Sequence, residues 1–312
     1  MTISAQISEK GYNHLGPKAL AVIGADTATR VIFCKQTHWI GYTKAKEVLG
    51  DLEDLLLHPM VHRMPCRLLL GATNNGKTAI LNRFVGQHPG VENASGDGIT
   101  VPVVAVEAPP KADESRLYGT ILDRLFVPYR HSDNAGKREV LVKFHLEALR
   151  TRVLLIDEVH NLLSGSSQRH HEALNVIRNL TNTLRISIVA AGTRAAFNAI
   201  QTDPQVANRF IPVVLPRWEM GQDFERLLVS FERLLPLRLP SHLAQDEPLA
   251  MKLFSLMEGK IGELSSFLTT ATIAAIESGH ERIDTPLIQD LLRRGKWHPP
   301  SERKVLSDCL GD

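Results

Sequence analysis

The chain has 312 residues, of which 43% are hydrophobic and 22% charged, with a formal net charge of +2 at pH 7. This composition is ordinary for a globular protein with a sizeable core, and it excludes a nucleic-acid binder that acts through bulk charge alone. The three cysteines form no CxxC pair, and no apolar run approaches the roughly 20 residues of a membrane helix, so we expect a cytoplasmic protein without disulfides or membrane contact.

Residues 1–65 predict an N-terminal extension that contains one amphipathic helix. Apolar residues recur at helical spacing within residues 42–57, which favours a helix with one buried face. The earlier stretch 19–34 is also fairly apolar, but Asp26 and Arg30 interrupt it, so it predicts no element.

Residues 66–216 alternate strand-like and helix-like patterns, which indicates an α/β domain with a parallel sheet and helices on both faces. The expected strands are 67–71, 100–107, 153–156, 186–191 and 211–215. The expected helices are 77–87, 114–125, 136–150 and 168–184. The pattern therefore predicts a five-stranded parallel sheet flanked by helices.

Residues 217–312 predict a C-terminal helical lid followed by a basic tail. Helical patterns recur at 222–235, 248–258, 261–278 and 285–294. The stretch 293–304 holds five Lys or Arg residues against one Glu. This tail either binds a partner or nucleic acid, or is a frayed end of the chain.

A glycine-rich loop follows the first strand of the α/β domain and precedes a helix. It consists of Gly71, Ala72, Thr73, Asn74, Asn75, Gly76, Lys77 and Thr78. Backbone N–H groups in such a loop point at phosphate oxygens, so the eight residues are expected to bind ATP. Lys77 would reach the β- and γ-phosphates, and the Thr78 hydroxyl would help to hold Mg²⁺.

Two acids, Asp157 and Glu158, end the apolar strand 153–156. The carboxyl ends of parallel strands are where open α/β sheets bind ligands. We therefore expect Asp157 to hold Mg²⁺ and Glu158 to polarise the attacking water, which makes the protein an ATPase.

Two polar residues near later strands are further catalytic candidates. Thr193 follows the strand 186–191, where it would sense the γ-phosphate or cap the next helix. Arg209 precedes the last strand, where it would serve as an arginine finger for a neighbouring subunit, lie on the surface without such a role, or form an internal ion pair.

Basic residues follow the second expected strand: Lys111, Arg116, Arg124, Arg130, Lys137 and Arg138. They either contact DNA phosphates or form a solvated helical face. His160, His170 and His171 lack a third ligand at suitable spacing, so they predict no metal site.

Together these motifs resemble an AAA+ ATPase, and the narrower resemblance is to the TniB/TnsC family of transposition regulators. Apart from the motifs above, it is carried by segments 39–42, 156–163, 192–194, 208–210, 258–264 and 300–303. The resemblance runs from about residue 37 to the C-terminus. Segments 39–42 and 261–264 are the parts that point to the family rather than to ATPases in general.

The resemblance implies an ATP- and Mg²⁺-dependent regulator that oligomerises as a ring or helical filament on duplex DNA. Such proteins link a target selector, usually of the TniQ type, to the transposase. The resemblance also implies that Trp39 and Ile40 lie close to the nucleotide and that the stretch after the second strand faces DNA. Lys111, Arg116 and Arg130 are the DNA-binding candidates in that stretch.

One departure from the AAA+ pattern concerns the lid helix. Many AAA+ proteins place an arginine there that touches the γ-phosphate, whereas this chain has Glu263. Either a basic residue from elsewhere substitutes, or hydrolysis is slow.

Two other functions remain open at this point. A helicase-loader-like AAA+ ATPase would prefer single strands, and the N-terminal region shows no aromatic-rich platform for stacking bases. A P-loop kinase acting on a small molecule would need a hydroxyl acceptor, whereas Asp157 and Glu158 favour activated water.

Overall fold

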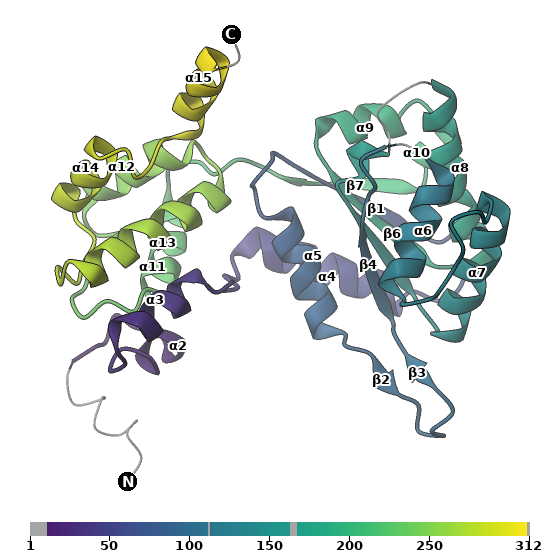
Figure 1. The fold of residues 1–312 in the computed structure, drawn as a ribbon, viewed down its shortest axis with the longest axis horizontal. Coiled ribbons are helices and arrows are strands. Elements are labelled where there is room, and N and C mark those ends of the chain that lie inside the picture. The colour runs from purple at the N-terminus through teal and green to yellow at the C-terminus, as the bar shows by residue number, and fades with distance from the viewer. Residues whose placement is uncertain (1–10, 112, 163–166, 311–312) are drawn as a thin grey trace. The chain divides into compact units, whose positions relative to one another are not determined.

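The computed structural model describes residues 11–111, 113–162 and 167–310. The chain divides into two compact units, one formed by Thr43–Pro216 and the other by Met1–Tyr42 together with Arg217–Asp312. Figure 1 shows the α/β architecture of the first unit and the helical architecture of the second. Within the described ranges, no helix is long and apolar enough to cross a membrane.

A five-stranded sheet forms the centre of the α/β unit. Its strands are β4 (Val103–Glu107), β5 (Val153–Asp157), β6 (Ser187–Gly192), β1 (Cys66–Gly71) and β7 (Phe210–Leu215), in that spatial order. All four neighbouring pairs are parallel, so the predicted five-stranded parallel sheet is confirmed. The inner strands β5 and β6 are almost wholly buried because helices cover both faces of the sheet.

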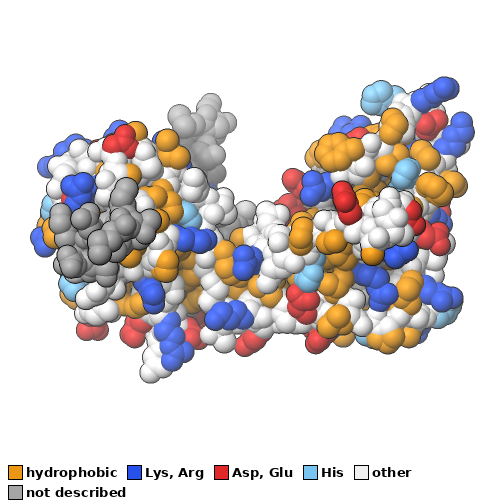
Figure 2. Space-filling view, turned by 90° about the horizontal axis from the view of Figure 1, so that it is seen from below, with side chains coloured by type: hydrophobic (Ala, Val, Ile, Leu, Met, Phe, Trp, Pro, Cys, Tyr) orange, Lys and Arg blue, Asp and Glu red, His pale blue; other side chains and the backbone are white. Residues whose placement is uncertain are grey.

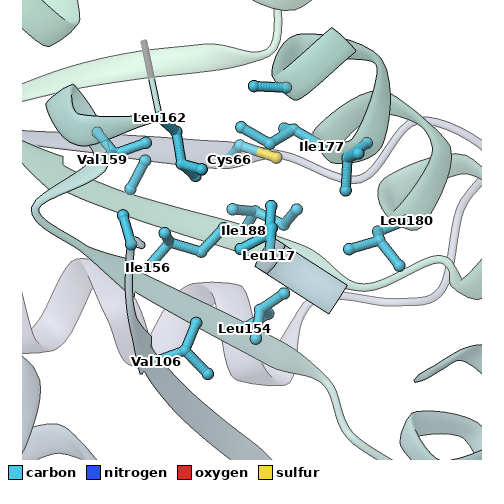
Figure 3. Close-up of a cluster of buried hydrophobic side chains, with 14 of the residues drawn as sticks. Cys66, Val106, Leu117, Leu154, Ile156, Val159, Leu162, Ile177, Leu180 and Ile188 are labelled. Carbon is cyan, nitrogen blue, oxygen red and sulfur yellow. The ribbon is translucent and has the colours of Figure 1, made fainter. Parts of the chain in front are cut away.

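The helices of this unit divide between the two faces of the sheet. They are α4 (Thr43–Leu57), α5 (Lys77–Gln87), α6 (Glu114–Arg124), α7 (Ala135–Ala148), α8 (Ser167–Leu184), α9 (Arg194–Ile200) and α10 (Pro204–Ala207). Helices α4 and α5 lie on one face, and α6, α7 and α8 lie on the other (Figure 1). Figure 3 shows the core on the second face, where Leu117, Ile177 and Leu180 pack over strand residues Leu154 and Ile188.

Two prolines shape the sheet. Pro102 has no N–H group to give to a strand, and β4 begins after it rather than at the predicted Thr100. Thr100 instead belongs to a short hairpin of β2 (Val91–Glu92) and β3 (Ile99–Thr100), which the sequence did not predict. Pro212 lies within β7, which tolerates it because β7 is an edge strand.

The second unit is helical, as expected for the C-terminal region. Its helices are α2 (Pro17–Leu20), α3 (Thr27–Lys35), α11 (Gln222–Glu232), α12 (Glu247–Met257), α13 (Ile261–Glu277), α14 (Thr285–Arg293) and α15 (Pro300–Leu310). Phe224, Leu253, Phe267 and Ile288 are fully buried members of its core. The long apolar face of α13 is central to this cluster.

The units divide the N-terminal region differently from the predicted extension 1–65. Of the described residues, 11–42 belong with the C-terminal helices, whereas α4 belongs to the α/β unit. Asp26 and Arg30, which interrupt the apolar stretch 19–34, explain part of this difference. Asp26 accepts a hydrogen bond from Thr29 N at 2.9 Å as the N-cap of α3, and Arg30 is buried against the C-terminal helices.

The last residues of the basic stretch, 300–304, begin helix α15, and this beginning of the helix bonds to the rest of the helical unit. Ser301 N donates to Glu258 Oε1 at 2.8 Å. Arg303 pairs with the buried Glu263 and lies over the Trp297 ring, 5.4 Å from its centroid. The acid that departs from the AAA+ pattern is therefore neutralised by an arginine of the tail.

A buried ion pair joins α3 to the segment before α14. Arg30 Nη1 donates to Glu281 Oε1 at 2.8 Å, and Arg30 Nη2 donates to Pro236 O at 2.6 Å. Burial raises the pKa of Glu281, but the hydrogen bonds and charges of Arg30 and Arg238 outweigh burial and hold this pKa below its ordinary 4.5. A lowered pKa in the folded state stabilises the fold above pH 4.5, and this contribution is lost as the pH falls through the folded-state value.

We predict that Glu281→Ala destabilises the helical unit by about 3–5 kcal/mol, because it leaves the Arg30 guanidinium buried without its anion. Urea unfolding of the full chain, followed by circular dichroism, measures this change. The control is Glu277→Ala, which removes an exposed acid of α13. Equal stability of the two variants would show that the buried pair contributes little.

Candidate nucleotide-binding site

The glycine-rich loop has the backbone of a phosphate cradle. It connects β1 to α5, as predicted, and its residues Asn74 and Gly76 have positive φ angles of 60° and 88°. Gly76 is the N-cap of α5, so the first N–H groups of that helix face the loop. Gly71 permits a close approach of strands, because a Cβ there would lie 3.3 Å from Leu215 Cβ. These features favour anion binding at the helix N-terminus.

Lys77 lies folded across its own loop. Its Nζ donates to Gly71 O at 3.1 Å and to Ala72 O at 3.0 Å, and the residue is only 4% exposed. Burial lowers the pKa of Lys77, while the charges of Glu158 and Asp157 oppose that shift. The loop thus holds a lysine beside two carboxylates, where it can contribute charge to a bound phosphate.

Thr78 and Asp157 meet across the sheet. Thr78 Oγ1 donates to Asp157 Oδ2 at 2.5 Å, and Asp157 Oδ1 accepts from Glu158 N at 2.8 Å. A hydroxyl and a carboxylate are hard oxygen ligands, and Mg²⁺ commonly takes one or two such groups together with phosphate oxygens and water. The donor set therefore fits Mg²⁺. Among the described residues, no three His, Cys, Asp or Glu side chains form a metal site of their own.

Glu158 has a left-handed backbone conformation, with φ 51°, directly after β5. Such a conformation is uncommon for a residue with a side chain, and strain of this kind gathers at functional sites. A further acid, Glu107, was missed in the sequence. It ends β4 in register with Asp157, so a third carboxylate lies at the same edge of the sheet. Its position at the end of an apolar strand was the available signal.

Asn75 has a structural role that the loop pattern did not reveal. Its side chain is 2% exposed, and Nδ2 donates to Leu215 O at 3.1 Å and to Pro216 O at 2.9 Å. The amide therefore fastens the loop to the end of β7, and Pro216 is the last residue of the α/β unit. The predicted contact of Asn75 with nucleotide can involve only its backbone in this arrangement.

Thr193 lies at the tip of β6, which stands between β1 and β5 in the sheet. It occupies the N-cap position of α9, but its side chain makes no capping hydrogen bond. The residue is thus placed between the glycine-rich loop and Asp157, as expected for a group that contacts the γ-phosphate. That contact remains a prediction.

Arg209 lies at the opposite edge of the sheet. Its carbonyl accepts from Cys66 N at 3.1 Å, at the start of β1, whereas the glycine-rich loop follows the end of that strand. Six residues of strand span about 20 Å. Arg209 Nη1 donates to Thr181 Oγ1 at 3.0 Å and to Asn182 Oδ1 at 2.7 Å. Both partners are neutral, so these hydrogen bonds are not the internal ion pair that was one expectation for Arg209.

Trp39 and Ile40 belong to the helical unit, where Ile40 packs against the hydrophobic core. Their predicted closeness to the nucleotide remains a prediction. His160 lies near Glu158 in the α/β unit. The side chains of His170 and His171 lie outside the described residues.

The three DNA-binding candidates are exposed, whereas Arg138, another basic residue of the same stretch, is buried. Lys111 and Arg130 are exposed, and Arg116 pairs only loosely with Asp113 at 3.9 Å. Arg138 is buried and donates to backbone carbonyls, including that of Ser115 at 3.0 Å, so its suggested contact with DNA is wrong. On the face shown in Figure 2, the Lys and Arg side chains are interspersed with Asp and Glu side chains.

We predict that Asn75→Ala destabilises the α/β unit by about 1–3 kcal/mol, because the carbonyls of Leu215 and Pro216 lose the donor that Asn75 provides. The same variant should weaken ATP binding, since the loop loses its attachment. Thermal unfolding and titration with a fluorescent ATP analogue measure both effects. In the control Asn74→Gly, an exposed residue with positive φ is replaced by one that tolerates that conformation. Equal behaviour of the two variants would contradict the role of the amide.

Solved structures with similar folds support the fold class. The ORC2 protein of Aeropyrum pernix, in its ADPNP–ADP complexes, is 16% identical and has a TM-score of 0.60 over 83% of this chain and 70% of that one. The ORC1 protein of the same organism, in complex with DNA, is 17% identical, with a TM-score of 0.56 over 85% and 69% of the two chains. The Walker-type ATPase PABY2304 of Pyrococcus abyssi is 15% identical, with a TM-score of 0.53 over 84% and 75%. At such identities the likeness shows the P-loop AAA+ fold alone.

The sequence also matches a family model, that of the bacterial TniB protein, over residues 30–220. The match spans more than half of the chain and includes the glycine-rich loop, Asp157 and Glu158, Thr193 and Arg209. The chain belongs to the TniB family.

Proposed function

We propose that this chain is an ATP-dependent, DNA-binding transposition regulator that oligomerises on duplex DNA and links target-site selection to transposase recruitment. The observation that carries the proposal is the contact of Thr78 with Asp157 beside the buried Lys77, in a chain of the TniB family. Duplex DNA, the transposase and a TniQ-type selector are the proposed partners. The cytoplasm is the proposed location.

The chemistry proposed for this site is ATP hydrolysis. The loop backbone and Lys77 bind the phosphates, and Thr78 with Asp157 holds Mg²⁺, which neutralises charge on the phosphates when bound. Glu158 takes a proton from the attacking water, whose oxygen forms a bond to the γ-phosphorus while the bond to the bridging oxygen breaks. ATP binding assembles the oligomer, and hydrolysis lets it come apart.

The position of Arg209 supports a site shared between subunits. It lies at the edge of the sheet opposite the glycine-rich loop, so it is far from the phosphates that its own chain would bind. Among the described residues, its buried Nε has no hydrogen-bond partner, and Nη1 donates only to the neutral side chains of Thr181 and Asn182. These hydrogen bonds do not neutralise the charge of Arg209. A second copy of the chain is the proposed recipient of this charge.

The exposed basic residues after β4 support contact with the DNA backbone. Lys111, Arg116 and Arg130 are exposed, and among the described residues the side chains of Lys111 and Arg130 form no ion pair, whereas Arg116 has one with Asp113 at 3.9 Å. Phosphate contacts of such side chains bind DNA with little sequence preference. The solved ORC1 structure shows that a protein of similar fold binds DNA.

We predict that Lys77→Ala abolishes ATP-dependent assembly, because the phosphates lose their cation. Glu158→Gln should keep ATP affinity within about twofold but lower hydrolysis by about 10²-fold or more, because the general base is lost, and so trap a persistent assembly. Electron microscopy with duplex DNA and ATP, with ATPase assays in parallel, measures both effects. Equal loss of ATP affinity in both variants would show that the assignment of Glu158 is wrong.

The same imaging experiment tests the function as a whole. Rings or filaments on duplex DNA in the presence of a non-hydrolysable ATP analogue are the expected result, and the combined Lys111→Ala, Arg116→Ala and Arg130→Ala variant should bind ATP but not DNA. Only isolated monomers at low salt would overturn the proposal. Preference for single strands would favour the helicase-loader-like function, and transfer of phosphate to a metabolite without DNA would favour a kinase.

We predict that Arg209→Ala and Lys77→Ala are each inactive alone but complement each other when mixed. Lys77→Ala does not assemble alone, but in the mixture ATP bound to Arg209→Ala can drive assembly, and Lys77→Ala supplies the arginine. Up to about a quarter of the interfaces then contain both an intact loop and an arginine. ATPase activity of the equimolar mixture measures this. Activity no greater than the sum of the separate variants would show that Arg209 does not act across a subunit interface.

A further inference from the structure

His160 lies against the acid proposed to activate water. Its Nδ1 is 3.1 Å from Glu158 Oε2. Among the residues that the structure describes, the buried Nδ1 makes no hydrogen bond, with Glu158 or with any other group. A buried polar atom without a hydrogen bond costs free energy, so its presence calls for an explanation. A hydrogen bond to Glu158 in another state of the site would supply one.

The turn that carries His160 is firmly fixed. It is the 3₁₀ turn η2 (Val159–Asn161), in which Asn161 N donates to Glu158 O at 2.9 Å. Val159 and Leu162, on either side of the ring, are fully buried in the core, and Figure 3 shows both pointing into it. Packing therefore sets the backbone position of His160, whereas the two side chains are about equally exposed, at 30% for His160 and 32% for Glu158.

The tip of β6 packs against the same turn. A Cβ at Gly192 would lie 2.9 Å from Ala196 Cβ and 3.2 Å from Val159 Cγ1, so only glycine permits this approach. Thr193 follows directly, at the position proposed to contact the γ-phosphate. His160 is thus held between the two strand ends that carry Glu158 and Thr193.

Lys77 is a second cationic group in the site, and its Nζ donates to Gly71 O and Ala72 O. The charge of Glu158 acts on Lys77 within the same site. A carboxylate drawn towards the lysine would not be directed at a water molecule. A second donor on the other side would prevent this and would hold one carboxylate oxygen while leaving the other free.

We propose that His160 is a positioning residue for water activation. When ATP is bound, the Glu158 carboxylate rotates so that Oε2 accepts a hydrogen bond from Nδ1–H of His160, and Oε1 takes the proton from the attacking water. The water oxygen then forms its bond to the γ-phosphorus as ADP leaves. This role rests on the proposed ATPase function and deepens it, because His160 acts only through Glu158.

Steady-state ATPase kinetics of His160→Ala, His160→Asn, Glu158→Gln and the double variant His160→Ala with Glu158→Gln test the role. We expect His160→Ala to lower kcat about tenfold or more, a part of the 10²–10⁴ that a general base contributes, with KM and ATP affinity within about twofold. His160→Asn should recover most of kcat, because its amide N–H replaces the donor. In the Glu158→Gln background, His160→Ala should cause no further loss.

The control is His62→Ala, which removes an exposed histidine of the same unit and should leave kcat unchanged. Thermal unfolding accompanies each assay, and His160→Asn keeps the test valid if the alanine variant does not fold. A kcat of His160→Ala within twofold of the original chain, or the same loss with and without Glu158, would overturn the role of His160 alone. Absence of hydrolysis by the original chain would overturn the ATPase function on which it rests.

Discussion

The contact between Thr78 and Asp157 is the constraint on which the arrangement of the candidate site depends. The two residues are 79 positions apart, and their strands are not neighbours, because β6 lies between β1 and β5. They meet because all strands run parallel, so the carboxyl ends of β1, β5 and β6 share one edge of the sheet. A helix that begins directly after the loop then brings the Thr78 hydroxyl to the Asp157 carboxylate.

Close packing around this contact limits what can move. Gly71 lets the loop approach β7, Asn75 fastens it there, and Gly192 lets the tip of β6 approach the turn after Glu158. Backbone and apolar groups are thus fixed, whereas the charged side chain of Glu158 is about one-third exposed. This combination of rigid support and a partly exposed charge suits a site that must change its contacts when a triphosphate enters and when it is hydrolysed.

The same parallel topology separates Arg209 from the loop of its own chain. Residues that precede a strand lie at one edge of a parallel sheet, and residues that follow a strand lie at the other. Arg209 belongs to the first edge and Thr193 to the second, although only 16 positions separate them. A catalytic role for both therefore implies two copies of the chain, which agrees with the proposal that assembly and hydrolysis are coupled.

By itself, the sequence determined the parallel α/β sheet, the glycine-rich loop, the acids at the end of β5, the helical C-terminal region and the family. These follow from local patterns, because apolar runs, turn glycines and the residues beside them are contiguous in the chain. Only the tertiary structure decided that residues 11–42 pack with the C-terminal helices through Arg30 and Glu281, and that Arg303 neutralises Glu263. It also decided the contacts of Asn75, the closeness of His160 to Glu158 and the burial of Arg138. Partners distant in sequence set the environment of each of these side chains, and a local pattern carries no record of them.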